Sequence, residues 1–233
     1  MKLALLGDIH GNDFALAAVL AAARRAGVEK LLITGDFIGY YFRPSQVIDM
    51  LEDWDVTAVR GNHEDMLSRA LAEPDYLNEV DRIYGTGLRI AIDTLSMRRL
   101  QWLCALSHPA SMTIEGMSIL LCHGSPWDVD QYIYPDAKAD LLERCAESGY
   151  DWVVMGHTHY PMVRKVGKTV LVNPGSVGQP RNRIPAAHWA LLDTASQELT
   201  LMTAPYDVSP VVALAAQRHP ELPYLGNVLL GKR

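Results

Sequence analysis

Side chains that commonly bind metal ions stand at the ends of five short apolar runs in this chain. Each is an aspartate, asparagine or histidine close to a glycine, which permits tight turns. The five segments are Asp8-Ile9-His10, Gly35-Asp36, Gly61-Asn62-His63-Glu64, Cys122-His123-Gly124 and Gly156-His157-Thr158-His159. Side chains at the carboxyl ends of neighbouring strands converge in space, so these segments predict a shared site with carboxylate, amide and imidazole donors.

Seven of these side chains are candidate ligands, which is enough for two divalent ions that share one carboxylate. They are Asp8, His10, Asp36, Asn62, His123, His157 and His159. Asp8 and His10 are two residues apart, so at a strand end both can reach one ion. A single histidine after a strand is more often an ordinary core or surface residue. Five such segments in one chain nevertheless favour a metal site.

The composition limits the partners that we expect. The 233 residues suit one domain, and a net charge of −6 without a long basic run makes nucleic acid or an anionic membrane surface an unexpected partner. Three cysteines without a CxxC pair favour a reduced, cytoplasmic setting. The initial apolar run is too short for a signal peptide, and no run is long enough to span a membrane.

The first part of the chain alternates between short apolar runs and helical patterns. Strands are predicted at residues 3–6, 30–34 and 56–59, and helices at residues 14–26 and 44–54. Such alternation predicts a parallel sheet with right-handed crossovers. Residues 64–107 have helical periodicity and no strand pattern, which predicts two or three helices beside the sheet or over the site.

The second part is rich in hairpin patterns. Paired runs are found at 110–114 with 117–121, 162–166 with 169–172, and 188–193 with 198–203. A helix is expected at 137–148, a buried strand at 152–155 and a further helix around 210–218, after which the tail looks irregular. Both parts fit one domain over residues 1–233 with an α/β fold, in which two mixed β-sheets pack face to face and helices lie outside.

The order of the five motifs resembles that of the calcineurin-like metallophosphoesterase superfamily. The matching series runs from Gly7-Asp8-Ile9-His10-Gly11-Asn12 to Gly156-His157-Thr158-His159. A further stretch, Asn173-Pro174-Gly175-Ser176-Val177-Gly178-Gln179-Pro180-Arg181, resembles the small bacterial and archaeal phosphodiesterase branch. The resemblance implies a four-layer αββα sandwich, in agreement with the pattern of elements.

The resemblance also implies how the ligands are shared between two divalent ions. One ion would be held by Asp8, His10 and His159, the other by Asn62, His123 and His157, with Asp36 between them. Two ions about 3.5–4 Å apart can activate water and stabilise the charge of an in-line displacement at phosphorus. The nitrogen and oxygen donors suit Mn, Fe or Zn better than Mg or Ca.

His63 matches the catalytic histidine of the family, which does not bind metal, and could act as a general acid. The alternative is a histidine that only orients a ligand. The candidate substrate contacts are Asn12, Arg43, Arg181 and Arg183, since a guanidinium grips phosphate well. Arg181 is favoured because it lies in the resembling stretch. Tyr132 and Tyr134 could stack on an aromatic group of the substrate, although packing within their loop is the commoner role.

One departure from relatives bears on the substrate. Protein phosphatases that share the Gly61-Asn62-His63-Glu64 motif carry an arginine soon after the second motif's aspartate, as does the dinucleoside tetraphosphatase branch. Here Asp36 is followed by Phe37-Ile38-Gly39-Tyr40-Tyr41. The leading hypothesis is therefore a metal-dependent hydrolase of small phosphodiesters or phosphomonoesters, of nucleotide type.

Several alternatives remain open at this point. One is a non-catalytic metal-binding scaffold that resembles retromer subunits, which lose catalytic or ligand histidines. Others are a protein phosphatase and a nuclease. The complete set of seven ligands with His63 favours an enzyme, and the acidic charge disfavours a nuclease. A homo-oligomer is compatible with the sequence.

Overall fold

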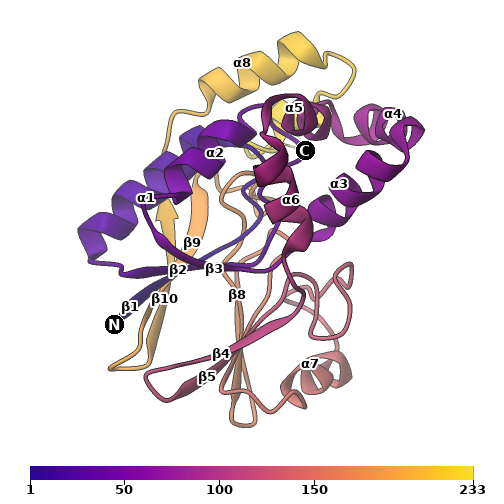
Figure 1. The fold of residues 1–233 in the computed structure, drawn as a ribbon. Coiled ribbons are helices and arrows are strands. Elements are labelled where there is room, and N and C mark those ends of the chain that lie inside the picture. The colour runs from indigo at the N-terminus through magenta and orange to yellow at the C-terminus, as the bar shows by residue number, and fades with distance from the viewer. Residues whose placement is uncertain (233) are drawn as a thin grey trace.

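The computed structural model describes residues 1–232, in which two mixed five-stranded sheets pack face to face (Figure 1). The first sheet has the order β10-β9-β1-β2-β3. Its strands are β1 (Lys2–Leu6), β2 (Lys30–Ile33), β3 (Asp55–Ala58), β9 (Ala187–Asp193) and β10 (Glu198–Ala204). β1, β2 and β3 are parallel, as predicted, and the β9–β10 hairpin adds two antiparallel strands beside β1.

The second sheet has a parallel centre and one antiparallel strand at each edge. Its order is β4-β5-β6-β8-β7. The strands are β4 (Ala110–Ile114), β5 (Met117–Leu121), β6 (Trp152–Val154), β7 (Met162–Val166) and β8 (Thr169–Asn173). β5, β6 and β8 are parallel, while β4 and β7 pair antiparallel at the two edges. The three predicted hairpins are thus confirmed.

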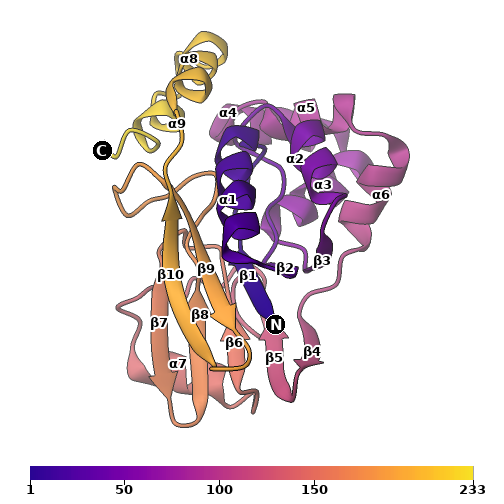
Figure 2. The ribbon, with the colours of Figure 1, turned by 90° about the vertical axis from the view of Figure 1, so that its left-hand side faces the viewer.

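Helices cover the outer face of each sheet. α1 (Asp13–Ala26) and α2 (Pro44–Leu51) lie on the first sheet, and α7 (Ala139–Ala146) lies on the second (Figure 2). α1 begins where the Asn12 side chain accepts a hydrogen bond from the Ala15 amide, and it ends at Gly27 in the left-handed conformation. The four-layer αββα sandwich predicted from the sequence is confirmed.

The alternation of side chains along the strands produces separate cores. In β1, Leu3 and Leu5 point between the sheets, where they join Leu121 and Val154, whereas Ala4 and Leu6 pack under the helices. Cys122 follows β5 and is fully buried in the core beneath α7. The central strands of both sheets are therefore covered on both faces, and their ends are held at fixed positions.

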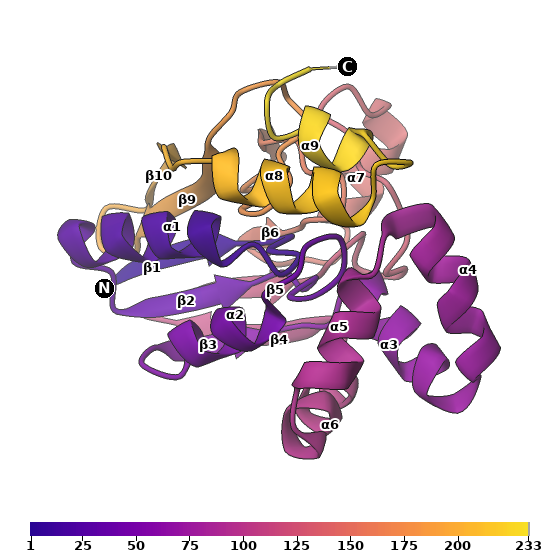
Figure 3. The same cartoon turned by 90° about the horizontal axis from the view of Figure 1, so that it is seen from above.

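The helical segment between β3 and β4 has four helices, so the prediction of two or three was wrong. They are α3 (Asn62–Ala72), α4 (Pro74–Tyr84), α5 (Gly87–Thr94) and α6 (Met97–Ala105). Pro74 begins a new helix directly after α3, and Ser96 caps α6 with its side chain. These helices project to one side of the sheets (Figure 3).

The C-terminal segment is more ordered than its sequence indicated. α8 (Ser209–Arg218) was predicted, but the short helix α9 (Tyr224–Asn227) was not. The Tyr41 hydroxyl donates to the Leu225 carbonyl at 3.0 Å, and the Thr86 amide donates to His219 Nε2 at 3.0 Å. This segment therefore holds the loop after β2 against the α4–α5 turn. No helix within residues 1–232 is long and apolar enough to cross a membrane.

Candidate metal centre

All seven predicted ligands meet at one end of the two sheets. Asp8 and His10 follow β1, Asp36 follows β2, and Asn62 begins α3 directly after β3. The other three ligands follow β5 and β6. Asn62 is partly exposed, and the other six ligands are buried. The donor atoms of these six form groups within 4.8 Å of one another, and His63 joins His10 and Asp36 in one further group. The convergence predicted from strand ends is thus observed.

The backbone of this site adopts an uncommon conformation. Five of the ligand residues have a backbone φ between 52° and 66°, a region that residues other than glycine rarely adopt. They are Asp8, His10, Asp36, His157 and His159. Such backbone persists only where surrounding contacts impose it, and it gathers at functional sites. Here neighbouring loops supply those contacts, because the His10 amide donates to the Asp36 carbonyl at 2.9 Å and the Gly178 amide donates to the Asp8 carbonyl at 3.0 Å.

The first group of donors consists of Asp8, His10 and His159. His10 Nδ1 donates to the Ile38 carbonyl at 3.1 Å, and His159 Nδ1 donates to the Gln179 carbonyl at 2.6 Å. Burial keeps the pKa of both imidazoles well below the usual range, so each ring is neutral and its Nε2 carries a lone pair. These two Nε2 atoms face each other at 3.2 Å. Two lone pairs at this separation repel unless a cation lies against both.

The second group consists of Asp36, His123 and His157, with Asn62 beside it. His123 Nδ1 donates to the Thr34 carbonyl at 2.7 Å, which leaves His123 Nε2 facing the site. That atom lies 2.9 Å from Asn62 Oδ1 and 3.1 Å from His157 Nδ1. Burial lowers the pKa of His157 to about 3, so its ring is neutral.

Asp36 lies between the two groups. Its Oδ2 is 3.6 Å from His10 Nε2 and 3.4 Å from His123 Nε2. Its Oδ1 accepts the His63 amide at 3.0 Å, at the N-terminus of α3. Burial by itself would raise the pKa of Asp36, but the imidazoles of His123 and His63 hold that pKa well below its usual range. Asp36 is therefore an anion within reach of both groups.

The electrostatics favour positive charge in this site. Burial by itself would lower the pKa of His123, yet the carboxylates of Asp36 and Asp8 raise it to about 10. Burial raises the pKa of Asp8 to about 7, and its Oδ2 is buried without a hydrogen-bond partner. An orphaned carboxylate oxygen and paired imidazole lone pairs are the donors that divalent cations require. The residues present therefore fit bound divalent metal ions.

Glu64 organises the site without facing it, and the sequence alone did not indicate this role. Its buried carboxylate accepts hydrogen bonds from three backbone amides, those of Asp36 at 2.8 Å, Phe37 at 2.9 Å and Gly61 at 2.8 Å. One side chain thus joins the loop after β2 to the start of α3. The position of Asp36 relative to Asn62 depends on this carboxylate.

Replacing Glu64 with alanine is expected to lower the free energy of unfolding by about 3 kcal/mol or more. Three buried amides would lose their acceptor, and each buried donor left without a partner costs about 1–3 kcal/mol. Urea unfolding in chelator would measure this without a contribution from metal binding. Glu73→Ala is the matched control, since Glu73 ends the same helix in an exposed ion pair with Arg69. Equal stability losses in the two variants would contradict the role given to Glu64.

A small cavity opens beside the ligands. Its volume is about 100 Å³, and its walls include His63, Arg181, Tyr40, Tyr84 and Tyr132. The Arg181 guanidinium donates to the Tyr40 hydroxyl at 3.0 Å. The His63 ring packs 4.7 Å from the His10 ring, between centroids, and its Nδ1 is buried without a partner. Tyr40 and Tyr84 were not predicted, because only the folded chain brings them together.

Other candidate substrate contacts lie elsewhere. Both polar atoms of the Asn12 side chain are occupied, since Oδ1 caps α1 and Nδ2 donates to the Gly178 carbonyl at 2.9 Å and to the Tyr206 hydroxyl at 3.0 Å. Asn12 is absent from the cavity wall, so we assign it to structure rather than to substrate. Arg43 pairs with Asp13 at 3.1 Å.

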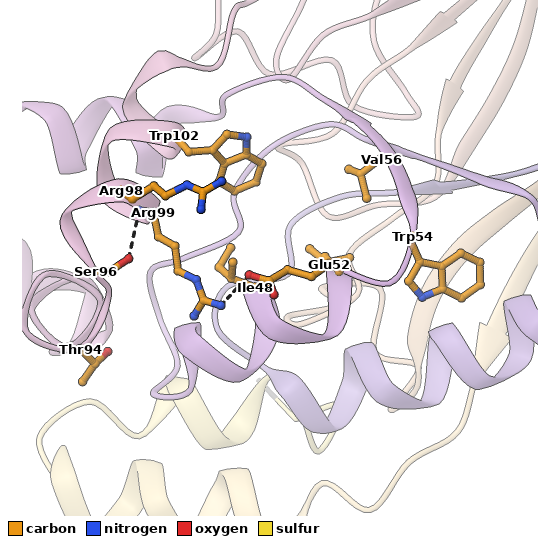
Figure 4. A pocket seen from close by; sticks show the side chains of 10 residues that line it. Ile48, Glu52, Trp54, Val56, Thr94, Ser96, Arg98, Arg99 and Trp102 are labelled. Carbon is orange, nitrogen blue, oxygen red and sulfur yellow. Dashed lines mark hydrogen bonds and ion pairs between the residues drawn. The ribbon is translucent and has the colours of Figure 1, made fainter.

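A larger hollow of about 850 Å³ lies between α2, β3 and α6 (Figure 4). Trp54 and Trp102 stand at its sides, and Arg99 donates to Glu52 at 2.7 Å across it. None of the predicted ligands and none of the cavity tyrosines line it. Size alone would therefore indicate the wrong place for the chemistry.

Comparisons with known proteins identify the family of this chain. A family model for the calcineurin-like phosphoesterase superfamily domain matches residues 1–197. An uncharacterized protein of Methanocaldococcus jannaschii is 28% identical over 228 residues, with 88% of each chain covered. Phosphodiesterase YfcE of Escherichia coli is 26% identical over 201 residues, which cover 82% of this chain and 87% of YfcE.

Solved structures share the whole fold. A metallophosphoesterase from Sphaerobacter thermophilus has a TM-score of 0.78 at 25% identity, with 99% of this chain and 100% of that chain covered. A hypothetical protein from Pyrococcus horikoshii OT3 has a TM-score of 0.86 at 23% identity, with 100% and 99% covered. The resemblance noted in the sequence is thus confirmed. The chain belongs to the calcineurin-like phosphoesterase superfamily and is a metal-dependent phosphoric ester hydrolase.

Proposed function

We propose that this chain uses two divalent metal ions to hydrolyse phosphodiester or phosphomonoester bonds in small substrates of nucleotide type. The observation that carries the proposal is the position of Asp36 between two groups of donors. Asp8, His10 and His159 would hold one ion, while Asn62, His123 and His157 would hold the other. Such ions, when bound, activate water and stabilise charge on the phosphoryl group.

The donor set favours Mn, Fe or Zn. Four of the seven proposed ligands are imidazoles, which suit these metals better than they suit Mg or Ca. Three of these imidazoles, those of His10, His123 and His159, are oriented by backbone carbonyls. Outer contacts of this kind fix the tautomer and raise the basicity of the nitrogen that faces the metal.

Two residues of the cavity would act on the substrate directly. Arg181 donates from Nη2 to the Tyr40 hydroxyl and to Gln179 Oε1. The N–H groups of its other two nitrogens can grip phosphoryl oxygens. Arg181 would replace the phosphate-binding arginine that protein phosphatases carry soon after the aspartate of the second motif and that this chain lacks after Asp36. His63 would hold a proton for the leaving oxygen, because its ring lines the same cavity as Arg181.

The alternatives from the sequence gain no support. A scaffold does not need seven converging ligands and a buried histidine beside them. A protein phosphatase must admit a phosphorylated side chain on a protein surface, whereas this cavity is narrow and lined by tyrosines. The rings of two of these tyrosines, Tyr40 and Tyr84, pack against each other and against His63.

Metal-stripped protein is expected to hydrolyse bis-p-nitrophenyl phosphate or p-nitrophenyl phosphate only after Mn²⁺ is added back. Release of p-nitrophenol measures the rate, and the ratio of the two substrates distinguishes diester from monoester preference. Asp55→Asn, at the opposite end of β3, is the control that should keep full activity. Absence of turnover with Mn²⁺, Zn²⁺, Fe²⁺ and Ni²⁺, in protein that demonstrably binds the metal, would reject the proposal.

A further inference from the structure

Two exposed tyrosines stand at the edge of the cavity. Tyr132 is 43% exposed and Tyr134 is 39% exposed, although both belong to a loop that is otherwise anchored. Their rings are nearly parallel, with centroids 5.6 Å apart and 13° between the planes. Aromatic rings left open to solvent add little to folding, so an exposed pair beside a functional site indicates a binding surface.

The local sequence explains why both rings face outward. Ile133 stands between them and is 2% exposed, packed in the core beneath α7. Because side chains alternate along an extended chain, Tyr132 and Tyr134 share one side of the backbone, and Ile133 lies on the other. The loop is fixed upstream, where the Ser125 amide donates to the Asp128 carbonyl at 2.8 Å and the Asp128 amide donates to Ser125 Oγ at 3.0 Å. The pair is thus presented on a constrained loop.

The pair is continuous with the metal centre. The Tyr132 ring lies 4.0 Å from the His157 ring, between centroids, and Tyr132 lines the same cavity as His63 and Arg181. That cavity has about 100 Å³, whereas pockets that enclose a whole small ligand have about 300–1,000 Å³. A phosphoryl group can occupy it, but the organic part of a nucleotide must lie outside.

The other two tyrosines of the cavity wall, Tyr40 and Tyr84, are less exposed than Tyr132. Tyr40 is only 6% exposed and is held by Arg181 and by ring contacts with His63 and Tyr84. Tyr132 is therefore the most exposed aromatic side chain of the cavity wall. Every nucleobase has a π-face, and aromatic side chains bind bases by stacking without strong sequence preference.

We propose that Tyr132 and Tyr134 form the subsite for the base of the substrate, so that the base stacks on this pair while its phosphoryl group occupies the cavity. The inference rests on the proposed function and makes it more specific. The substrate class is then a phosphoester that carries a planar aromatic group, such as a nucleotide. A sugar phosphate without a base would occupy the cavity but would not stack on the tyrosine pair.

Binding of AMP and of ribose 5-phosphate to the metal-loaded protein tests this subsite. Calorimetric titration is expected to give a Kd for AMP about tenfold lower than the Kd for ribose 5-phosphate. A tenfold difference corresponds to the lower end of the free energy that stacking of one base contributes. The Tyr134→Leu variant should reduce this ratio, and the Tyr132→Leu/Tyr134→Leu variant should bring it close to one. Tyr76→Leu, about two turns from the cavity residue Tyr84 along α4, is the matched control that should keep the ratio.

Equal affinities of the two ligands for the wild-type protein, or an unchanged ratio in Tyr134→Leu and in the double variant, would overturn the subsite. Tyr134→Leu is informative even if loss of Tyr132 disturbs His157, because the ring contacts of Tyr134 are with Tyr132 and Tyr160. Metal content measured for each variant identifies such a disturbance.

Hydrolysis separates failure of the subsite from failure of the proposed function. Bis-p-nitrophenyl phosphate and methyl p-nitrophenyl phosphate share a leaving group and differ only in the second ester. The ratio of their kcat/KM values should favour the aromatic diester and fall in Tyr134→Leu. Turnover of both with a ratio that the variant does not change would reject the subsite alone. Absence of turnover of either by metal-loaded protein would reject the function and the subsite together.

Discussion

Replacing Asp36 with asparagine is expected to abolish hydrolysis and to release metal from both groups of donors. The amide has nearly the same shape, but it cannot place an anionic oxygen within reach of His10 and of His123 at once. Substitution of a residue that only orients a metal ligand lowers metal affinity or activity by about 10–100-fold. Loss of a ligand that both ions share should therefore lower them by more than about 100-fold.

The measurement is metal content per chain together with the rate on bis-p-nitrophenyl phosphate. Asp55→Asn serves as control, because Asp55 is an exposed carboxylate on the same sheet that pairs with Lys30 at 2.8 Å. Thermal unfolding of both variants in chelator would show whether the fold survives. An Asp36→Asn protein with normal metal content and rate would remove Asp36 from the site.

Replacing His63 with glutamine is expected to lower kcat by about 10²–10⁴-fold, which is the usual contribution of general acid–base catalysis. Glutamine keeps most of the volume beside the His10 and Tyr40 rings, which lie 4.7 and 5.0 Å from the His63 ring between centroids. The backbone amide that binds Asp36 is unchanged by the substitution. Metal content should therefore stay near that of the wild-type protein.

This pair of readouts separates a catalytic histidine from one that only orients a ligand. In the second case the metal content of His63→Gln would fall in parallel with its rate, and added Mn²⁺ would restore the rate. His108→Gln is a suitable control, since His108 precedes β4 and lies outside the ligand groups and the cavity wall. A rate in His63→Gln within a few-fold of the wild type would contradict its role.

The strands were predictable because their evidence is local. Apolar runs that end in glycine and a ligand residue each correspond to a strand end, and hairpins were identified from turns such as Glu115-Gly116. The number of helices between β3 and β4 was not predicted correctly, although the proline at position 74 is typical of the start of a helix. α9 is only four residues long and is stabilised by packing of Leu225 against the loop after β2, which no local pattern reveals.

The convergence of the candidate ligands was predictable for the same reason, since strand order places successive strand ends together. The surroundings of the ligands were not. Asn12 lies within the first motif and was expected to contact substrate, whereas its side chain caps α1 and donates to the Gly178 carbonyl. Tyr40, Tyr84 and Tyr132 come from three distant segments and meet only in the folded chain.

Metal content of the purified wild-type protein tests the central claim most directly. After saturation with Mn²⁺ and removal of excess by dialysis, elemental analysis should give two ions per chain, and Asp36→Asn should give fewer. A wild-type ratio of two together with metal-dependent hydrolysis is what two groups of donors around Asp36 predict. A ratio of one or zero in protein that hydrolyses phosphoesters would contradict the dinuclear centre.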